Sequence, residues 1–480
     1  MQSYQKWAKE YGPVYSLILG NSVVIVLSSD EAVRDLLDKR SAIYSSRPDN
    51  YIGQTIISDN NRLIFMKHHD PQWKMIRRLG HNLLNIQKAE SYVPYQDLES
   101  TQMLYEMVTE PERFLDSVRR FTASLTTSLT FGLRTVSFRD PRMTALFDGV
   151  QEITELSQNP AAMLLDVFPI LRWLPDVLLS VRKRARALQP IDKELRMDHW
   201  LEAKHAVKAG TANPCFCVDM ARVQEKEGLS DDLAAYTAGS MLEAGAETTS
   251  NTLYGFVQAM LLFPVVQHKI QTRIDEVVGD DRLPMMSDYA QLPYIRSCIK
   301  ESLRWMPTAI MVFPHAVTED DTYRGYHIPK GASVLPNGYT IQMDPERHLE
   351  PRQYNPDRYN DDDLSLADSA ANPDASKRDH FNFGAGRRIC QGMHVAERSL
   401  FLGIARLMWA FDITPAQDDE GRDVLPDPDR YTQGFICMPE PFRATIRPRS
   451  EKRARIIREV WEQEQKRCLD PETQQWKVAL

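Results

Sequence analysis

One ten-residue segment near the C-terminal end constrains the fold more than any other part of the chain: Phe383-Gly-Ala-Gly-Arg-Arg-Ile-Cys-Gln-Gly392. It holds a single cysteine, Cys390, between glycines, and a helical pattern follows at once. A thiolate at the start of a helix is favoured by the helix dipole, and N–H groups beside glycine can donate hydrogen bonds to sulfur. The segment therefore predicts a loop that presents one sulfur atom at a helix N-terminus.

A cysteine in such a loop has two alternative roles. A thiolate can be the proximal ligand of haem iron, and Arg388, two residues earlier, could then reach a haem propionate. The other role is that of a structural thiol buried in an ordinary loop-to-helix turn. The pattern Phe-x-x-Gly-x-Arg-x-Cys-x-Gly is long and ordered, which favours the iron ligand over the structural thiol.

This pattern resembles the cysteine loop of the cytochrome P450 family of haem-thiolate monooxygenases. The resemblance implies haem b (iron protoporphyrin IX) as the cofactor, Cys390 as the axial iron ligand, and O2 as a cosubstrate. It also implies an acid–alcohol pair in a long helix and then a Glu-x-x-Arg helix, both before the cysteine, and the chain contains these motifs in that order. Gln391 departs from the family, in which a small apolar residue usually follows the cysteine.

The acid–alcohol motif Ala244-Gly-Ala-Glu-Thr-Thr249 lies in a helix predicted from about residue 233 to residue 262. A glycine within a helix costs about 1 kcal/mol relative to alanine, and threonine can bond back to a carbonyl one turn earlier. The glycine and the threonine each weaken the regular helix, so together they predict a local widening. A helix-packing contact would give the same spacing. The resemblance implies that Glu247 and Thr248 are catalytic residues that deliver protons.

The segment Lys300-Glu-Ser-Leu-Arg304 supplies the Glu-x-x-Arg motif. Glu301 and Arg304 share one helix face, and such a pair on a surface contributes at most about 0.5 kcal/mol. The resemblance implies instead a buried structural pair, completed by Arg358.

Further cofactor contacts follow from the resemblance. In Trp73-Lys-Met-Ile-Arg77, the first and last residues share a helix face, and the spacing resembles the family's early Trp-x-x-x-Arg motif, which contacts the haem propionates. His69 and His315 lie where the family often supplies further propionate donors, although a single histidine is more often an ordinary surface or core residue. The predicted cofactor-binding residues are Cys390, Arg388, Trp73, Arg77, His69, His315, Phe383 and Gly384.

The substrate pocket is also predicted from position in the family. Its lining should include residues 51–65 and Ile436. The predicted pocket residues are Ala244, Met241, Thr308, Met311, Val312 and Phe435. Aromatic and aliphatic groups prevail among them, so we expect a largely apolar, drug-sized small molecule as the substrate.

Hydrophobic periodicity predicts one large domain over residues 1–480, mainly α with a small β-rich portion, as in the cytochrome P450 fold. Residues 15–27 carry two β-branched runs around Gly-Asn, which is typical of a hairpin. Residues 72–262 are dominated by helical periodicity, and short apolar pieces after Pro307 indicate small β-units. Residues 450–480 form a highly charged pattern that predicts an exposed helical tail.

Composition limits the partners and the compartment. Lys+Arg 58 against Asp+Glu 66 gives a net charge of −8, which argues against nucleic acid as a partner. Six scattered cysteines indicate reduced thiols in a cytosol-facing protein. Neither a transmembrane helix nor a secretory signal is predicted, so the chain as given is expected to be soluble. Eukaryotic members of the family usually carry an N-terminal membrane anchor; with one, the native protein would lie on the cytosolic face of the endoplasmic reticulum.

The resemblance is strongest to fungal microsomal members that modify secondary metabolites. It implies electrons from NADPH through NADPH-cytochrome P450 reductase, with Lys74, Arg78 and Arg387 as candidate basic contacts. The expected reaction is hydroxylation, oxidative cyclisation or coupling of a polyketide, terpenoid or alkaloid. Two alternatives remain: a haem-thiolate isomerase or dehydratase that does not activate O2, and a non-enzymatic haem-binding sensor. The substrate and the site of oxidation are not predicted.

Overall fold

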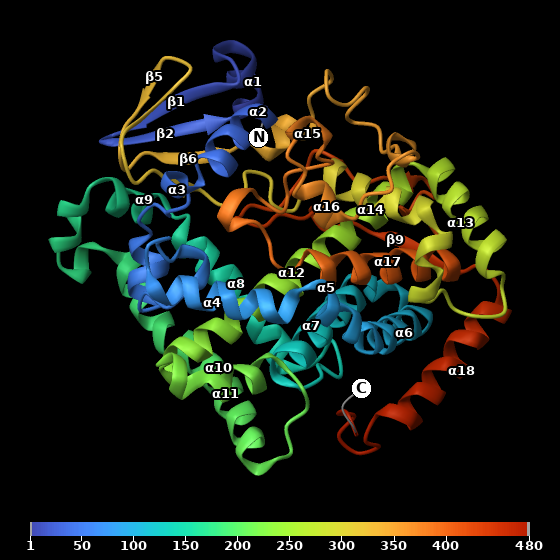
Figure 1. Cartoon of the computed structure of the whole chain (residues 1–480). Coiled ribbons are helices and arrows are strands. Elements are labelled where there is room, and N and C mark those ends of the chain that lie inside the picture. Colours follow the sequence, from blue (N-terminus) through green and yellow to red (C-terminus); the bar gives the residue numbers. More distant parts are fainter. Residues whose placement is uncertain (1, 478–480) are drawn as a thin grey trace.

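The computed structural model describes residues 2–477 and confirms a mainly α fold with a small β-rich portion. The strands β1 (Val14–Leu19), β2 (Ser22–Leu27) and β6 (Ser333–Pro336) lie with the N-terminus at one end of the molecule, whereas β9 (Ala444–Pro448) lies apart from them among the helices (Figure 1). Within residues 2–477, no helix is both long enough and apolar enough to cross a membrane.

Helices form most of the described chain. The α-helices are α1 Gln2–Tyr11, α2 Asp30–Val33, α3 Ser41–Tyr44, α4 Pro71–Leu84, α5 Ile86–Ser91, α6 Val93–Thr109, α7 Phe114–Phe131, α8 Pro141–Ser157, α9 Pro160–Val167, α10 Ser180–Ala209, α11 Phe216–Glu227, α12 Asp231–Leu262, α13 Pro264–Val278, α14 Pro293–Trp305, α15 Gly338–Gln342, α16 Leu366–Ala370, α17 Met393–Ala410 and α18 Glu451–Cys468. Shorter helical turns include η1 Arg34–Lys39, η2 Tyr51–Ile57, η3 Leu63–Phe65 and η10 Gly386–Arg388.

The strands form three small sheets. They are β1 Val14–Leu19, β2 Ser22–Leu27, β3 His315–Ala316, β4 Asp321–Tyr323, β5 Tyr326–Ile328, β6 Ser333–Pro336, β7 Phe411–Gln417, β8 Asp423–Val424 and β9 Ala444–Pro448. The predicted hairpin is the antiparallel pair β1–β2, and β6 joins β2 in parallel, with Ile25 opposite Val334. The four-stranded order β1-β2-β6-β3 therefore brings the chain after α14 back to the N-terminal hairpin.

Helix α12 runs through the middle of the molecule (Figure 1) and packs against α7, α10 and α17. From Thr249 to Leu261 every residue of this helix is buried, as is expected of a helix that has neighbours on all sides. Leu253 on α12, Ile299 on α14 and Leu400 on α17 belong to the largest apolar cluster. This core fixes α12 relative to the cysteine loop, which leads directly into α17.

Glu301 on α14 forms the predicted buried ion pair. Its two carboxylate oxygens accept from Arg304 at 2.7 and 2.8 Å, and both side chains are completely buried. The carboxylate also accepts from the backbone N–H of Asn355 at 2.7 Å, and Nε of Arg358 lies 3.4 Å from it. Arg304 in turn donates to the carbonyl oxygens of Gln342 and Pro351. The pair therefore ties α14 to the segment that precedes the cysteine loop.

The cysteine loop packs tightly against η1, and two glycines make that possible. Gly384 and Gly386 have φ of +73° and +59°, which other residues adopt at a cost. A Cβ on Gly386 would lie 1.9 Å from the carbonyl oxygen of Leu37, so a side chain cannot be accommodated there. The N–H of Cys390 donates to the carbonyl of Phe383 at 2.8 Å and closes the loop.

The prediction of an exposed C-terminal tail is wrong for one face of α18. The helix forms as expected, but Ile457, Trp461 and Cys468 are buried, and the helix packs against α6. Arg453 is buried as well and donates to the carbonyl of Trp409 at 2.7 Å. In the sequence, charged residues outnumber the few apolar residues at helical spacing. These apolar residues nevertheless determine how the helix packs. Residues 478–480 of the predicted tail lie outside the described residues.

Replacing Glu301 should test the buried pair. Glu301→Ala leaves Arg304 buried without a counter-charge, so we expect the free energy of unfolding to fall by about 3–5 kcal/mol. Glu276→Ala is the matched control: Glu276 pairs with Arg273 at the same i, i+3 spacing, but both side chains are more than half exposed. The control should cost less than about 1 kcal/mol in urea unfolding. Equal losses in the two variants would contradict a structural role for the buried pair.

Gly386→Ala should destabilise the cysteine loop. Left-handed backbone costs a side chain about 1–2 kcal/mol, and overpacking against Leu37 adds about 1–3 kcal/mol. Gly331→Ala has a similar φ of +84° with nothing within 4 Å, and so isolates the backbone cost. Thermal unfolding of both variants measures the difference; if Gly386→Ala is no worse than Gly331→Ala, the loop does not depend on this contact.

Candidate active site

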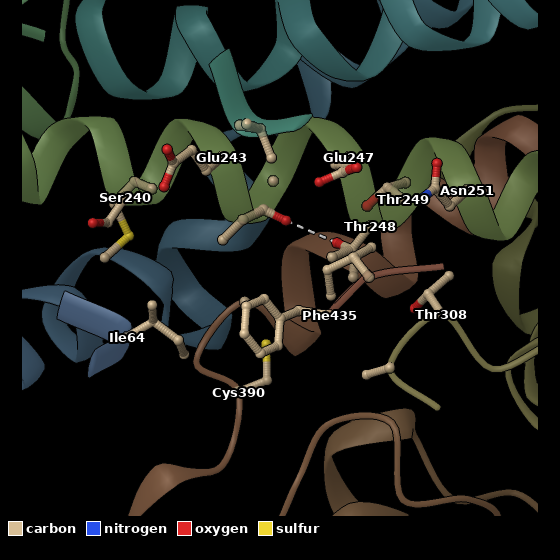
Figure 2. A pocket seen from close by; sticks show the side chains of 18 of the residues that line it. Ile64, Ser240, Glu243, Glu247, Thr248, Thr249, Asn251, Thr308, Cys390 and Phe435 are labelled. Carbon is tan, nitrogen blue, oxygen red and sulfur yellow. Dashed lines mark hydrogen bonds between the residues drawn. The ribbon is translucent and has the colours of Figure 1, made fainter. Parts of the chain in front are cut away.

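A cavity of about 900 Å³ lies between α12 and the cysteine loop. Cys390 projects from the loop toward α12, and Thr248 lies on the side of the helix that faces it (Figure 2). Ile64 of η3, Thr308 after α14 and Phe435 border the same space. Segments distant in sequence thus enclose one cysteine sulfur and the acid–alcohol motif together.

Most of the predicted site residues line this cavity. They are Glu247, Thr248, Cys390, Arg388, Trp73, Arg77, His315, Phe383, Gly384, Ala244, Met241, Thr308, Val312 and Phe435. Ile436 lines it too, and so do residues 62–65 of the predicted loop. Three aromatic rings meet at one wall: Phe435 lies 6.0 Å from Phe65 and 5.5 Å from Phe313 between ring centroids.

Residues 51–61 of the predicted loop do not line the cavity, and neither do two of the individually predicted residues. Met311 packs against the main apolar core instead, because Val312 takes a φ of +49° and adjacent side chains diverge at this turn. His69 is exposed, since it lies in the turn before α4. Its neighbour His68 points inward and contacts Trp73 and Arg387. His69 therefore lies outside the cavity, and His68 does not line it either. Met311 lies outside it because the turn at Val312 was not foreseen.

Near the cysteine loop, three guanidinium groups border the cavity without a carboxylate partner among the described residues. Arg47, which sequence reasoning missed, donates to the carbonyls of Ile64, Phe313 and Pro314 at 2.6–3.0 Å. Arg388 donates to the carbonyl of Ser45 at 2.9 Å, and also to that of Met66. No short motif contains Arg47, so only the folded chain could reveal it.

Arg77 is the third of these groups, and it donates to the carbonyls of Arg387 and Ile389. Trp73 lies between two of the cations, with the Arg388 guanidinium 4.1 Å and that of Arg77 6.0 Å from its ring centroid. Burial lowers the pKa of Arg47, Arg77 and Arg388, because these groups lose water without gaining a counter-charge. The arrangement concentrates positive charge at one edge of the cavity and is suited to an anion.

His315 is buried beside this cluster. Its Nδ1 donates to the carbonyl of Tyr44 at 2.7 Å in the tautomer that fits the bond. Burial and the charge of Arg47 lower the pKa of His315 to about 3, so the ring is neutral beside these cations. A neighbouring anion would favour the protonated ring, whose Nε2–H could then donate to it.

The sulfur of Cys390 is enclosed. Burial raises the pKa of this thiol, whereas the N–H of Gly392 and the charge of Arg77 lower it. Burial is the largest of these effects, so a stable thiolate calls for a cation on the cavity side, as a bound metal supplies. Gln391, the residue that departs from the family pattern, turns away from the sulfur and donates to the carbonyl of Arg77 at 2.7 Å.

Helix α12 stays α-helical throughout the acid–alcohol motif, so the predicted local widening is not found. Its carbonyls receive side-chain donors instead. Thr248 Oγ1 donates to the carbonyl of Ala244 at 2.8 Å (Figure 2), and Thr122 of α7 donates to that of Ala246 at 2.6 Å. Gly245 lets α7 approach, since a Cβ there would lie 2.8 Å from Thr126. The glycine thus serves helix contact, which was the simpler explanation of the motif.

Glu247 lines the cavity next to Thr248, farther from Cys390 (Figure 2). Burial and the nearby charge of Glu243 raise the pKa of Glu247 to about 7, and Arg119 opposes that shift. A carboxyl with such a pKa exchanges protons readily near neutral pH, which suits a general acid.

A buried ion network near the cavity was not predicted. Glu243 on α12 binds Arg62 at 2.5 Å and also pairs with Arg196 of α10, and Asp192 accepts from both arginines. Gly239 lets the Arg196 side chain lie against α12, because a Cβ at that position would overlap it. Asp192 and Arg196 have i, i+4 spacing in the sequence, but their link to residues far away in the chain could not be foreseen.

The three candidate basic contacts all lie at the surface near the cysteine loop. Lys74, Arg78 and Arg387 are exposed. Arg78 forms an ion pair with Glu227 at 2.7 Å, and Arg387 contacts His68. Among the described residues, no group of three or more metal-ligating side chains occurs. Of the described cysteines, Cys390 is the one that lines this cavity.

Known proteins agree with this site. The sequence pattern of the family Cytochrome P450 matches residues 1–446. The chain is 50% identical to cytochrome P450 monooxygenase virE of Hypocrea virens over 96% of its length and 83% of the relative. It is 48% identical to cytochrome P450 monooxygenase fogE of Aspergillus ruber, over 95% of this chain and 85% of that one.

A solved zebrafish cytochrome P450 structure with progesterone has the same fold. Its TM-score is 0.77 at 24% identity, and the match covers 93% of this chain and 99% of that one. The cavity, the cysteine loop, the family pattern and the relatives lead to one conclusion: the chain belongs to the cytochrome P450 family and is an oxidoreductase of the monooxygenase type.

Proposed function

We propose that this protein uses haem b and O2, with two electrons from NADPH through NADPH-cytochrome P450 reductase, to hydroxylate, cyclise or couple a largely apolar fungal secondary metabolite. The observation that carries the proposal is the cavity itself. It places Cys390 on one side and the Glu247–Thr248 pair of α12 on the other.

The residues of the cavity fit haem b. Its two propionates would meet the buried Arg47 and the half-buried Arg77 and Arg388, which have no carboxylate partner among the described residues. Trp73 and His315 border the same edge and could donate to them. Phe383 and Gly384 of the loop border the cavity beside the sulfur. Haem b is an apolar macrocycle with two carboxylates and a metal that binds thiolate. It would satisfy both the hydrogen-bond donors at this edge and the sulfur of Cys390.

When bound, haem iron supplies O2 activation and electron transfer. The protein residues would supply position and protons. Cys390 holds the iron, and the tight contact of its loop with η1 fixes the sulfur. Thr248 keeps its hydroxyl on the cavity side of α12 by bonding to the Ala244 carbonyl. Glu247 would pass protons toward that hydroxyl, because its pKa of about 7 allows it to gain and lose a proton.

The aromatic wall of the cavity supports an apolar substrate. Phe65, Phe313 and Phe435 form one aromatic surface, with Val312 beside it. Such a wall favours a planar or polycyclic small molecule of the polyketide, terpenoid or alkaloid type. The exposed Lys74, Arg78 and Arg387 remain candidate contacts for the reductase, and the endoplasmic reticulum membrane, on its cytosolic face, remains the proposed location through an N-terminal anchor.

Turnover with a fungal reductase tests the proposal. Apolar candidate substrates should be converted only with both NADPH and O2, and a hydroxylated product should carry one oxygen atom from ¹⁸O2. Glu247→Gln and Thr248→Ala should lower product per NADPH by about 10–100-fold and release hydrogen peroxide instead, because proton delivery fails. Thr237→Ala is the matched control, since Thr237 makes the same bond to a carbonyl one turn earlier on α12 but lies outside the cavity.

The result also separates the alternatives. Conversion that needs neither NADPH nor O2 would favour an isomerase or dehydratase over the proposed reaction. Ligand binding without NADPH consumption would favour a sensor. An unchanged ratio of product to NADPH consumed in both Glu247→Gln and Thr248→Ala would contradict the proton role of this pair.

A further inference from the structure

The far end of the cavity, between α7, α8 and α12, holds polar groups that the proposed reaction does not use. Arg119 on α7, Gln151 on α8 and Asn251 on α12 line the same cavity as Glu247. Asn251 follows Glu247 by four residues, so the two side chains share one face of α12. Polar side chains therefore continue from the acid along its helix toward α7 and α8.

Arg119 is held in place without a charged partner among the described residues. Its guanidinium lies 5.3 Å from the ring centroid of Phe147, and Nη2 contacts the sulfur of Met438 at 3.6 Å. Its Nε is enclosed and has no acceptor. A buried donor without an acceptor costs about 1–3 kcal/mol, so an arginine kept in this position requires a partner that the protein chain does not supply.

Asn251 has the same unmet requirement. The residue is 1% exposed, and its Nδ2 is enclosed without an acceptor. Two orphan donors bordering one cavity near an ionisable carboxyl form a polar space that water can fill, since each bound water needs two to four polar partners.

The charges that face Glu247 come from four elements. On α12 itself, Glu243 is neutralised by Arg62 and Arg196. The α8 residues Asp148 and Glu155 line the outer part of the cavity.

In the segment before β9, Glu440 pairs with Arg430 at 3.1 Å, and the thiol of Cys437 is neutral because burial and the charge of Glu247 raise its pKa to about 11. On α7, Arg119 is the one cation that acts on Glu247.

We propose that Arg119 is a positioning residue for proton delivery: its guanidinium and the amide of Asn251 hold water against the Glu247 carboxyl, and this water relays protons to the carboxyl from the α7–α8 side of the cavity. The inference deepens the proposed function. The role that it gives Arg119 in turnover rests on that function. Arg119 would touch neither cofactor nor substrate and would act only through Glu247.

The test follows the protonation of Glu247 directly. Infrared spectra of the holoenzyme, recorded from pH 5.5 to 9, contain the protonated carboxyl band, and Glu247→Gln identifies the part that belongs to this residue. In the unmodified protein the intensity of this band should fall as the pH rises, with its midpoint near pH 7. Arg119→Gln should move the midpoint upward by about one pH unit, because a cation that favours the carboxylate is lost. Arg119→Lys keeps the charge and should restore the midpoint.

Arg139→Gln is the matched control. Arg139 also stacks on an aromatic ring, at 5.1 Å from Phe138, but it is exposed and pairs with Glu110. Its loss should leave the midpoint unchanged. Asn251→Leu removes an orphan donor without a charge, so it should keep the midpoint and raise peroxide per NADPH severalfold.

An unchanged Glu247 midpoint in Arg119→Gln overturns the inference, and so does an equal shift in Arg139→Gln. The titration is independent of turnover. A chain that binds haem but never oxidises NADPH would instead contradict the proposed function, whatever the infrared result.

Discussion

Buried positive charge at one edge of the cavity is the constraint on which the site depends. Arg47, Arg77 and Arg388 donate to backbone carbonyls, and none of them pairs with a carboxylate among the described residues. Carbonyl dipoles solvate a guanidinium but do not neutralise it, and a buried unpaired cation is costly. A dianionic cofactor removes that cost when it binds. Cofactor binding and folding of this region should therefore be coupled, since each bound anion stabilises the folded chain.

The rest of the architecture holds the cavity edges in place. The Glu301–Arg304 pair fixes α14 against the segment before the cysteine loop, and Gly386 allows the loop to pack on η1. On the other side, the network around Glu243 joins α12 to α10 and to Arg62. Ion pairs of this kind give geometry more than net stability, because desolvation offsets most of their attraction. Precise distances between the sulfur and α12 are what the proposed chemistry requires.

Local motifs were predictable because their spacing encodes their geometry. The cysteine loop, the Glu-x-x-Arg pair and the Trp73–Arg77 helix face were each contained within ten residues or fewer, and the structure brings them together as expected. Arg47 and Arg119 belong to no motif, and the spacing around them carries no signal. Their importance arises from side chains brought together by tertiary packing. His69 shows the limit of position in the family as a guide, since it lies in the turn before α4 and is exposed.

The central claim is that Cys390 is a thiolate ligand of haem iron facing α12. The most direct measurement is the absorption difference spectrum of the dithionite-reduced protein with and without carbon monoxide. A strongly red-shifted Soret band, lost in Cys390→Ala, is the result that this account predicts. A histidine-type spectrum, or well-folded protein that binds no haem when haem is supplied, would contradict it and leave Cys390 as a buried structural thiol.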